Sequence, residues 1–313
     1  MATRFASSPV LQALVLSLAV LLSMRTGAHA AEPGAASYLA EKNGAALVIS
    51  GVNHGGALQP PSAKLQDYFK NSTVVMSEMD ITDPARHATA TAEFRHGKAL
   101  AVRNFVSPEE LGVVHAAWMK KLKGKAAMTA STLGELHACG ISMFLLPAGG
   151  PPPAGATLPR TSPWERVFLP EAKRSGKPIV ELEPEGSLRV CGQLAPDQVR
   201  ALVLEPARLG LDDNARQHYL QQIEASRRSL ASGDDAASHA AMQNAIGFNE
   251  QYKLAMTRYM GIRNKTMVAV MEAQHAKLAP SSHGFVMLGA LHVHGADGIL
   301  ALLREKGFRI ARL

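Results

Sequence analysis

The sequence contains only two cysteines among its 313 residues, which excludes a disulfide-dense mini-protein and a zinc site built from four cysteines. It also has no His-Glu-x-x-His, no P-loop, no Gly-x-Gly-x-x-Gly after a strand and no Gly-x-Ser-x-Gly. The usual signals of zincin proteases, nucleotide-binding proteins and serine hydrolases are therefore missing. With 47% apolar and 19% charged residues, the composition is that of a globular protein and excludes disordered, collagen-like and coiled-coil classes.

Aromatic residues are scarce, at 5% of the chain, and this limits what the net charge of +7 can mean. A positive charge of this size raises the question of nucleic-acid binding. The densest basic cluster, residues 120–125, has no aromatic residues interleaved with it, as a base-stacking surface would require. Because cations also suit the C-terminal end of a helix, we interpret the cluster as a solvated helix end and expect no nucleic-acid partner.

The first thirty residues have the features of a secretory signal peptide. Arg4 gives a positively charged start, residues 10–22 are almost entirely apolar, and Ala28-His29-Ala30 matches a cleavage site. Cleavage after Ala30 would leave 283 residues and lower the net charge from +7 to +5, because Arg4 and Arg25 are lost. An uncleaved anchor is the alternative, but the run is short for a membrane span and no later stretch is long enough. We expect a periplasmic or secreted protein with no permanent span after cleavage.

Export changes the meaning of the two cysteines. Cys139 and Cys191 would lie in an oxidising compartment, where they are the only possible pair. We expect a disulfide between them, joining segments 52 positions apart. Two buried free thiols are the alternative.

Short apolar runs alternate with helical patterns along the mature chain. Strands are predicted at 46–50, 73–76, 141–146, 179–182, 284–288 and 308–313, and helices at 62–70, 107–123, 162–174, 247–278 and 297–306. This alternation predicts an α/β domain over 31–313, with a mainly parallel central sheet flanked by helices. Residues 31–45 are small and polar and are expected to be irregular. Residues 206–245 show no strand pattern and a break at 233–235, which predicts an inserted helical segment.

One sequence pattern, an apolar strand followed by Gly-x-x-His, occurs twice in the chain. An apolar strand leads into Gly51-Val52-Asn53-His54, and a second leads into Gly289-Ala290-Leu291-His292. In a parallel sheet, residues that follow the strands lie at the carboxyl edge, where ligand crevices form. We therefore expect His54 and His292 to converge, whereas a hydrogen-bonded structural histidine is the alternative for each alone.

Glutamates end two further strands, since Glu78 follows the strand at 73–76 and Glu183 the strand at 179–182. A buried carboxylate needs a cation nearby, although each could also turn out to solvent in the following loop. Two imidazoles and a carboxylate suit a divalent ion of the Zn, Mn or Co type, which would activate water. His54, Glu78 and His292 are the predicted ligands. His294 is assigned an outer-shell role, because alternate positions on an extended chain point in opposite directions.

A methionine-rich stripe on the long predicted helix includes an arginine. Residues 256, 260, 267, 270 and 271 recur at helical spacing, and Arg263 completes the same face. The stripe is interpreted as packing core. Since arginine is rarely buried unpaired, we expect Glu78, Glu183 or a substrate carboxylate beside Arg263, with a snorkelling arginine as the alternative.

These segments together resemble the TraB/GumN family, which includes the Tiki proteins. The resemblance rests on the first Gly-x-x-His, SEMD, GKPIVELEP, the helix with IRN and the C-terminal GFVMLGALHVHGADGILALLREKGFRIARL. It implies a fold related to the erythromycin-esterase and ChaN-like group and, for the Tiki branch, a divalent-metal-dependent peptidase. His54, His292, Glu78, Glu183 and the pair Arg263-Asn264 match the motif positions. Val52-Asn53 departs from the threonine-containing pair that is usual in the first motif, and Asn53 is assigned to the outer shell.

The expected function is an exported metal-dependent hydrolase that acts on a peptide or protein substrate. Glu183 or a neighbouring carboxylate would be the general base, Arg263 would orient a carboxylate or stabilise developing negative charge, and Asn264 joins them in the predicted catalytic set. Two alternatives stay open, namely an exported protein that binds a peptide or small ligand without turnover, and an accessory protein of envelope polysaccharide export. The sequence leaves the metal, the substrate and the oligomeric state open.

Overall fold

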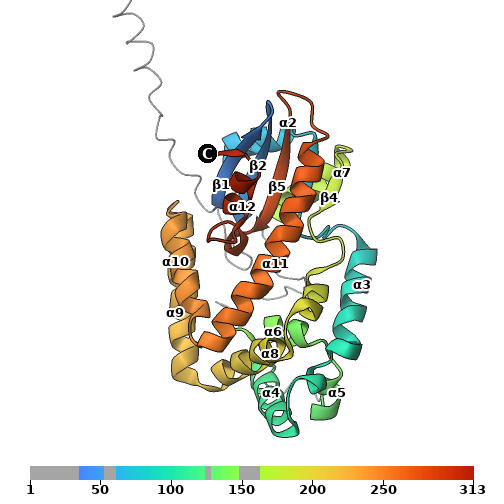
Figure 1. Ribbon diagram of the computed structural model, residues 1–313, viewed down its shortest axis with the longest axis vertical. Coiled ribbons are helices and arrows are strands. Elements are labelled where there is room, and N and C mark those ends of the chain that lie inside the picture. The colour runs from blue at the N-terminus through green and yellow to red at the C-terminus, as the bar shows by residue number, and fades with distance from the viewer. Residues whose placement is uncertain (1–34, 53–60, 124–127, 148–162) are drawn as a thin grey trace, which may run out of the picture. The chain divides into compact units, whose positions relative to one another are not determined.

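A six-stranded mixed sheet forms the centre of the protein, which is described here by a computed structural model over residues 35–52, 61–123, 128–147 and 163–313 (Figure 1). The spatial order of the strands is β4-β3-β5-β2-β1-β6. Their bounds are β1 Ala35–Lys42, β2 Ala45–Val52, β3 Val74–Ser77, β4 Ile179–Glu181, β5 His283–Gly289 and β6 Arg309–Arg312. Strands β4, β3, β5 and β2 are parallel to one another, and β1 is antiparallel to β2 and β6. The predicted α/β fold with a mainly parallel sheet is confirmed.

The register of the parallel strands brings their carboxyl ends to one edge. Ser77 of β3 pairs with Glu181 of β4 and with Met287 of β5, and Val52 of β2 pairs with Gly289 of β5. The central strands are buried along nearly their whole length, as expected where helices cover both faces of a sheet. This edge is therefore where the chain can place polar side chains beside one another.

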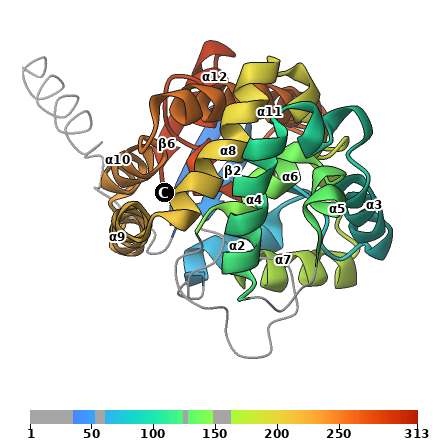
Figure 2. The same cartoon turned by 90° about the horizontal axis from the view of Figure 1, so that it is seen from below.

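Eleven helices among the described residues surround the sheet or pack beyond that edge (Figures 1 and 2). Their bounds are α2 Ala63–Asn71, α3 Pro84–Arg95, α4 Pro108–Lys121, α5 Ala130–Gly134, α6 Ala138–Leu145, α7 Pro163–Arg174, α8 Pro196–Leu211, α9 Asp213–Ala231, α10 Asp235–Ile246, α11 Glu250–His275 and α12 Ile299–Glu305. The five helices predicted from the sequence are present with slightly different ends. Helix α4 begins with a capping box, in which Ser107 and Glu110 satisfy each other's backbone N–H groups.

Helix α11 connects the two main parts of the core. Its first half packs with α4, α6 and α8 in a cluster that contains Tyr252 and Tyr259. Its second half places Met267 and Met271 against one face of the sheet, and α2 and α7 cover the other face. Residue 263 lies between these halves, so α11 delivers its side chain to the junction of the sheet edge and the helices.

The strand predicted at 141–146 is wrong, because this segment belongs to α6. Six of the eight residues of α6 are buried, so the helix is apolar on nearly all sides and its sequence shows no helical periodicity. A short, wholly apolar run cannot be assigned to strand or helix from periodicity alone. His137 is the N-cap residue of α6, and its side chain makes no capping hydrogen bond.

The irregular segment expected over 31–45 is also wrong where it is described, since Ala35–Lys42 forms β1. Asn43 and Gly44, with φ of 52° and 78°, turn the chain into β2. Positive φ at both central residues of a two-residue loop is the geometry of a type I′ hairpin, for which Asn-Gly is the preferred sequence. The hairpin signal was thus present in the sequence at positions 43–44.

Residues 206–245 are helical, as predicted, and the break near Gly233 separates α9 from α10. These two helices form an antiparallel pair at one side of the molecule (Figures 1 and 2). Helix α8 begins ten residues before the expected segment, at Pro196, and its buried residues belong to the core. The α9–α10 hairpin packs through its own small cluster, which includes Tyr219, Ile223 and Ala245, and reaches the main core through Leu230 and Ile246.

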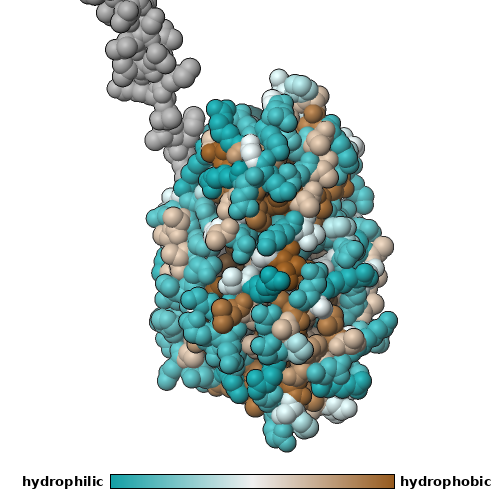
Figure 3. All heavy atoms as spheres, in the orientation of Figure 1, coloured by the Kyte–Doolittle hydropathy of each residue, from teal (hydrophilic) through white to brown (hydrophobic). Residues whose placement is uncertain are grey.

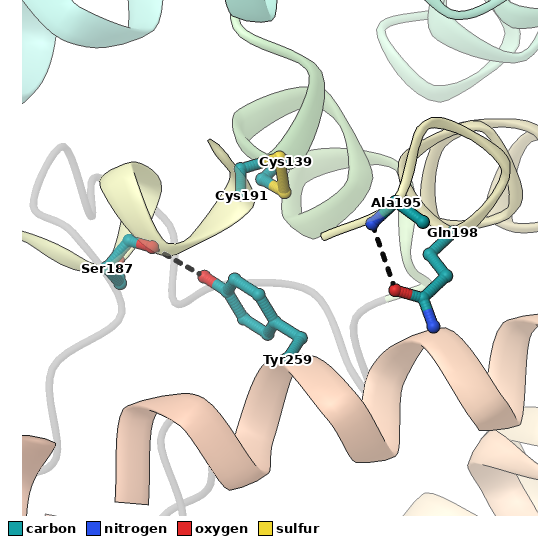
Figure 4. Close-up of a disulfide and its surroundings, with 6 residues drawn as sticks. All are labelled: Cys139, Ser187, Cys191, Ala195, Gln198 and Tyr259. Atoms are coloured by element: carbon teal, nitrogen blue, oxygen red, sulfur yellow. Dashed lines mark hydrogen bonds between the residues drawn. A yellow bond between two sulfur atoms is a disulfide. The ribbon is translucent and has the colours of Figure 1, made fainter. Parts of the chain in front are cut away.

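Cys139 and Cys191 form the expected disulfide, which joins α6 to the 3₁₀ segment η3, Ser187–Gln193 (Figure 4). Both cysteines are buried. Within the described ranges, no helix is both long and apolar enough to cross a membrane.

Hydrophilic side chains predominate on the face seen in Figure 3, with hydrophobic ones in small groups. Among the described residues, the large hydrophobic side chains that are exposed come from four different helices: Met143, Val167, Leu211 and Leu254.

Candidate active site at the carboxyl edge of the sheet

Three of the predicted site residues follow three neighbouring strands. Glu78 comes directly after β3, Glu183 two residues after β4, and His292 three residues after β5. His292 ends a short 3₁₀ segment, η4 Ala290–His292, and is 3% exposed. The shared register of β3, β4 and β5 brings these side chains to one place, as expected for the crevice at the carboxyl edge of a parallel sheet.

Arg263 of α11 enters this place from the helical side and binds both glutamates. Its Nε and Nη2 donate to the two carboxylate oxygens of Glu183, each at 2.7 Å, and Nη2 also donates to Glu78 Oε2 at 3.1 Å. Arg263 and Glu183 are 8% and 7% exposed. The arginine of the methionine-rich stripe is thus buried and paired, with both of the carboxylates expected for it.

The charge of Arg263 is secured by its surroundings. Burial alone would lower the pKa of the guanidinium, but Tyr259, Glu183 and Glu78 outweigh burial and raise this pKa above its ordinary value. Tyr259 lies one turn before Arg263 and donates its hydroxyl hydrogen to the Ser187 carbonyl at 3.1 Å (Figure 4). Burial, the largest influence, raises the pKa of Tyr259, so its hydroxyl stays protonated at neutral pH.

Glu78 connects Arg263 to the second Gly-x-x-His motif. Its Oε1 accepts a hydrogen bond from the backbone N–H of Gly289, the first residue of that motif. The same oxygen lies 3.8 Å from His292 Nε2. The carboxylate therefore faces the guanidinium with one oxygen and the imidazole with the other.

Asn264, the neighbour of Arg263 on α11, fixes the ring of His292. Its Nδ2 donates to the carbonyl of Asp297 at 2.6 Å, and since a carbonyl can only accept, its Oδ1 must face the other way. Oδ1 lies against His292 Nδ1, which must then carry the proton in the neutral ring. His292 Nε2 is left as an acceptor that faces Glu78. This is the arrangement in which a histidine that binds a metal is oriented by a second residue.

The first Gly-x-x-His motif is described only up to Val52. Asn53 and His54, the predicted outer-shell residue and metal ligand, lie outside the described residues. Val52 pairs with Gly289, so the two motifs leave adjacent parallel strands at the same edge. Within the described part of the chain, no group of three or more His, Cys, Asp or Glu side chains could hold a metal ion.

His294 belongs to a second cluster, centred on Asp235 at the start of α10. His294 Nε2 lies 3.0 Å from Asp235 Oδ2, and Arg312 Nη1 lies 2.6 Å from Asp235 Oδ1. The Tyr38 hydroxyl donates to the same carboxylate, which is only 4% exposed. The outer-shell prediction for His294 assumed an extended segment. The structure differs, because the residues before it form the 3₁₀ segment η4, which ends at His292.

Sequence reasoning missed the cluster around Asp235. Tyr38 lies in the segment expected to be irregular, Asp235 was seen only as part of a helix break, and Arg312 lies in the closing strand. The one available signal was a pair of adjacent acidic residues, Asp234 and Asp235. Asp234 caps α10, so the cap accounts for only one of the two.

A pocket of about 460 Å³ lies beside both clusters. Glu78, Glu183 and His292 line it from the sheet edge together with Arg263 of α11, and Asp235, His239 and His294 line it from the other side. Most of the remaining wall is apolar and includes Met143, Leu146, Tyr219, Ile223, Leu230, Met242, Met256 and Met260. The structure thus combines a charged, hydrogen-bonded floor with a mainly apolar wall, as is usual for ligand sites.

Comparison with known proteins gives one match. The model of the TraB/PrgY/gumN family matches residues 36–312, nearly the whole chain. No curated protein and no solved structure matches the sequence. All the site residues described above fall within the matched range.

Proposed function

The chain belongs to the TraB/PrgY/gumN family, and we propose that it is an exported, divalent-metal-dependent hydrolase that acts on peptide bonds. The observation that carries the proposal is the chain of contacts from Asp297 through Asn264 to His292. It makes His292 Nε2 the acceptor nitrogen of the ring, 3.8 Å from Oε1 of Glu78. A buried imidazole held in this way is suited to bind a cation.

The donor atoms fit an ion of the Zn, Mn or Co type. Imidazole nitrogen and carboxylate oxygen bind zinc at about 2.0–2.2 Å each. The 3.8 Å between His292 Nε2 and Glu78 Oε1 is shorter than two such bonds together, so one ion can contact both atoms. His54 is proposed as the third ligand, because its motif leaves the strand adjacent to β5 at the same edge. A bound ion would lower the pKa of a water molecule, so that this water more readily loses a proton and becomes a better nucleophile toward a carbonyl.

The remaining residues are proposed to hold and orient the reacting groups. Arg263 faces the pocket from a buried position and is suited to bind a carboxylate or to stabilise negative charge on a carbonyl oxygen. Both oxygens of Glu183 are bonded to Arg263, so Glu183 is proposed to position this guanidinium. A role of Glu183 as general base requires one of these hydrogen bonds to open. Asn264 is a positioning residue for His292, and Asn53 and His294 are kept as outer-shell proposals.

Export is part of the proposal. Residues 1–30 are proposed as a cleaved leader, and the disulfide between two buried cysteines suits an oxidising compartment.

The metal is tested on the full chain expressed with its leader and purified without chelator. Elemental analysis should find about one divalent ion per molecule, and His54→Ala and His292→Ala should lose it. Asn264→Ala should bind the ion about 10–100-fold more weakly, as is typical when a supporting residue is removed. His218→Ala, which removes an exposed histidine of α9, is the matched control and should keep it. Wild type that takes up no ion, or His292→Ala that binds it as well as wild type, would contradict the proposal.

The reaction is tested by digestion of a peptide library, read by mass spectrometry, with and without a chelator. Metal-dependent cleavage is expected. The second candidate function is binding without turnover, which the size of the pocket favours, since about 460 Å³ is in the range of ligand sites. Retained metal and bound peptides with no cleavage would support this second function.

A further inference from the structure

The methionine-rich stripe of α11 has two halves with different surroundings. Met267 and Met271 are fully buried and pack against the sheet, as expected for core residues. Met256 and Met260, which come earlier on the same face, are only partly buried and line the pocket at the sheet edge. Packing core therefore describes the second half of the stripe, whereas the first half also borders open space.

A second pocket, of about 440 Å³, adjoins the first, because several residues line both. Among these shared residues are Met256 and Met260 of α11 and Met242 of α10. The second pocket is lined by residues of α10 and α11 and by the segment 295–298, which follows the second Gly-x-x-His motif. Met242, Met256 and Met260 are called the methionine wall below, since they form a surface common to the two pockets.

The methionine wall reaches the candidate active site through Met260. The sulfur of Met260 accepts a hydrogen bond from Arg263 Nη1 at 3.8 Å, and Arg263 also binds the two strand-end glutamates. A ligand held beside Arg263 in the first pocket would therefore lie next to the methionine wall.

Methionine suits a wall that has to fit a ligand of variable shape. Its side chain is unbranched, has three rotatable bonds and carries a polarizable sulfur, so it can adjust to different apolar surfaces. Covering apolar surface that otherwise contacts water is favourable. Met143 of α6 is exposed and lines the first pocket, where it extends the apolar surface. A large apolar group is therefore the best partner for this wall.

Polar groups beside the wall favour a peptide as the carrier of that apolar group. Gln243 of α10 and Thr257 of α11 line the second pocket, and Thr257 is exposed, which places it where the pocket meets solvent. An amide and a hydroxyl can both donate and accept hydrogen bonds, as a peptide backbone requires. A purely hydrocarbon ligand would instead cover these groups without giving them partners, which is unfavourable.

We propose that Met242, Met256 and Met260 form a specificity subsite, which binds one large apolar side chain of the peptide substrate, such as leucine, methionine or phenylalanine. The inference rests on the proposed function in taking a peptide as the ligand. The apolar side chain would lie against the methionine wall, and the neighbouring part of the peptide would lie beside Arg263. Selection of this side chain would then determine which peptides are held at the sheet edge.

Binding is measured separately from cleavage by using His292→Ala, which lacks a proposed metal ligand and should bind peptides without cutting them. A random octapeptide library is passed over this immobilised variant, and the retained peptides are identified by mass spectrometry. The most strongly retained peptides are then synthesised again with each residue in turn changed to serine. Replacing one apolar residue should weaken binding at least about tenfold, a ratio that needs less free energy than full burial of a leucine side chain provides.

Variants of the wall show where this side chain binds. Met242→Glu or Met256→Glu, added to His292→Ala, should remove most of the difference between the apolar peptide and its serine counterpart, because a carboxylate is costly to cover with an apolar group. Met256→Leu keeps an apolar side chain and should keep most of the difference. Leu254→Glu, at an exposed position of the same helix, is the matched control and should change nothing. Thermal melting checks that each variant is folded.

Methionine oxidation gives a second measurement, which needs no change to the wall. Dilute hydrogen peroxide converts accessible methionine to the sulfoxide, and mass spectrometry of tryptic peptides gives the rate at each position. The retained octapeptide should slow oxidation of the methionine wall several-fold, and its serine counterpart at the same concentration should not. Met119 of α4, which packs against the helical core and lines neither pocket, should be oxidised at the same rate throughout.

A library from which no peptide is retained would overturn the inference, and so would binding that depends on no apolar residue. A preference that survives both Met242→Glu and Met256→Glu would also overturn it. These outcomes are distinct from a failure of the proposed function. Wild type that takes up no metal and cuts no peptide, yet shows a preference that Met256→Glu removes, would refute the hydrolase and leave the subsite in place. Metal-dependent cleavage without any apolar preference would refute the subsite alone.

Discussion

At the scale of single residues, Arg263 is the group on which both strand-end glutamates depend. It forms three hydrogen bonds to two carboxylates in a place where little water reaches. Breaking a buried ion pair by removing one partner leaves an uncompensated charge and costs about 3–5 kcal/mol. The arginine therefore contributes to stability as well as to the proposed chemistry.

Arg263→Met, which keeps the length of the side chain and removes its charge, should lower the free energy of unfolding by about 3–5 kcal/mol in urea denaturation. Arg258→Met, at an exposed position of the same helix, should change it by less than about 0.5 kcal/mol. Adding Glu183→Leu to Arg263→Met should recover part of the loss, because fewer buried charges remain unpaired. Equal stability of the two single variants would show that the pair contributes nothing.

The pairing of Arg263 could be predicted because each partner has a local signal. An arginine within an apolar helical stripe needs an anion, and a glutamate directly after a buried strand needs a cation. For Asn264, which orients His292, the family resemblance was the only indication of a role. Its function depends on the carbonyl of Asp297, 33 positions away, and no property of the residue type reveals such a backbone contact.

At the scale of elements, the α9–α10 hairpin depends on Asp235 for its attachment to the sheet. Asp235 contacts Tyr38 of β1, Arg312 of β6 and His294, which follows the second Gly-x-x-His motif. Arg312 also donates to the carbonyl of Gly233 in the turn between the helices. These contacts fasten the tip of the hairpin, and so one wall of the pocket, to the sheet.

Asp235→Ala should increase hydrogen exchange throughout residues 213–246, measured by mass spectrometry, while β2 and β5 stay protected. The reason is that the tip loses three polar contacts whose remaining groups are partly buried, a loss of about 1–3 kcal/mol. Asp234→Ala removes only the cap of α10, where the Asp234 side chain accepts from Ala237 N–H. It should cost about 1 kcal/mol and affect exchange only in the first turn of α10. Unchanged exchange across the hairpin in Asp235→Ala would show that the tip is held by apolar packing.

The elements themselves were largely predictable, and the errors have clear physical causes. The strands at 46–50 and 284–288 stood out because both faces of a central parallel strand are buried. Helix α6 is also buried on nearly all sides, so its apolar run imitated a strand. Strand β1 was missed because its small residues gave little apolar signal, although Asn43-Gly44 after it encodes the turn.

At the scale of the whole molecule, the disulfide links the helical core to the site. Cys191 lies in η3, which follows Glu183 by a few residues, and Ser187 of η3 accepts the hydrogen bond of Tyr259. Cys139 lies in α6. Met143 of the same helix and Leu146, its C-cap residue, line the pocket. Figure 4 shows the bridge beside the contact between η3 and α11. The bridge thus constrains the unfolded chain and, in the folded state, holds η3 against the helices.

Cys139→Ala/Cys191→Ala should lower the free energy of unfolding by about 4 kcal/mol, the chain-entropy value for a loop of 52 residues. Alanine is the replacement of choice because serine would bury an unsatisfied hydroxyl. Since both cysteines are buried, dithiothreitol should reduce the native bridge slowly, and faster as urea opens the fold. In urea unfolding, the oxidised wild type should have the highest midpoint. The reduced wild type and the variant should both unfold at one lower midpoint. Three equal midpoints, or two alkylatable thiols in the unreduced protein, would show that no stabilising bridge connects the helical core to η3.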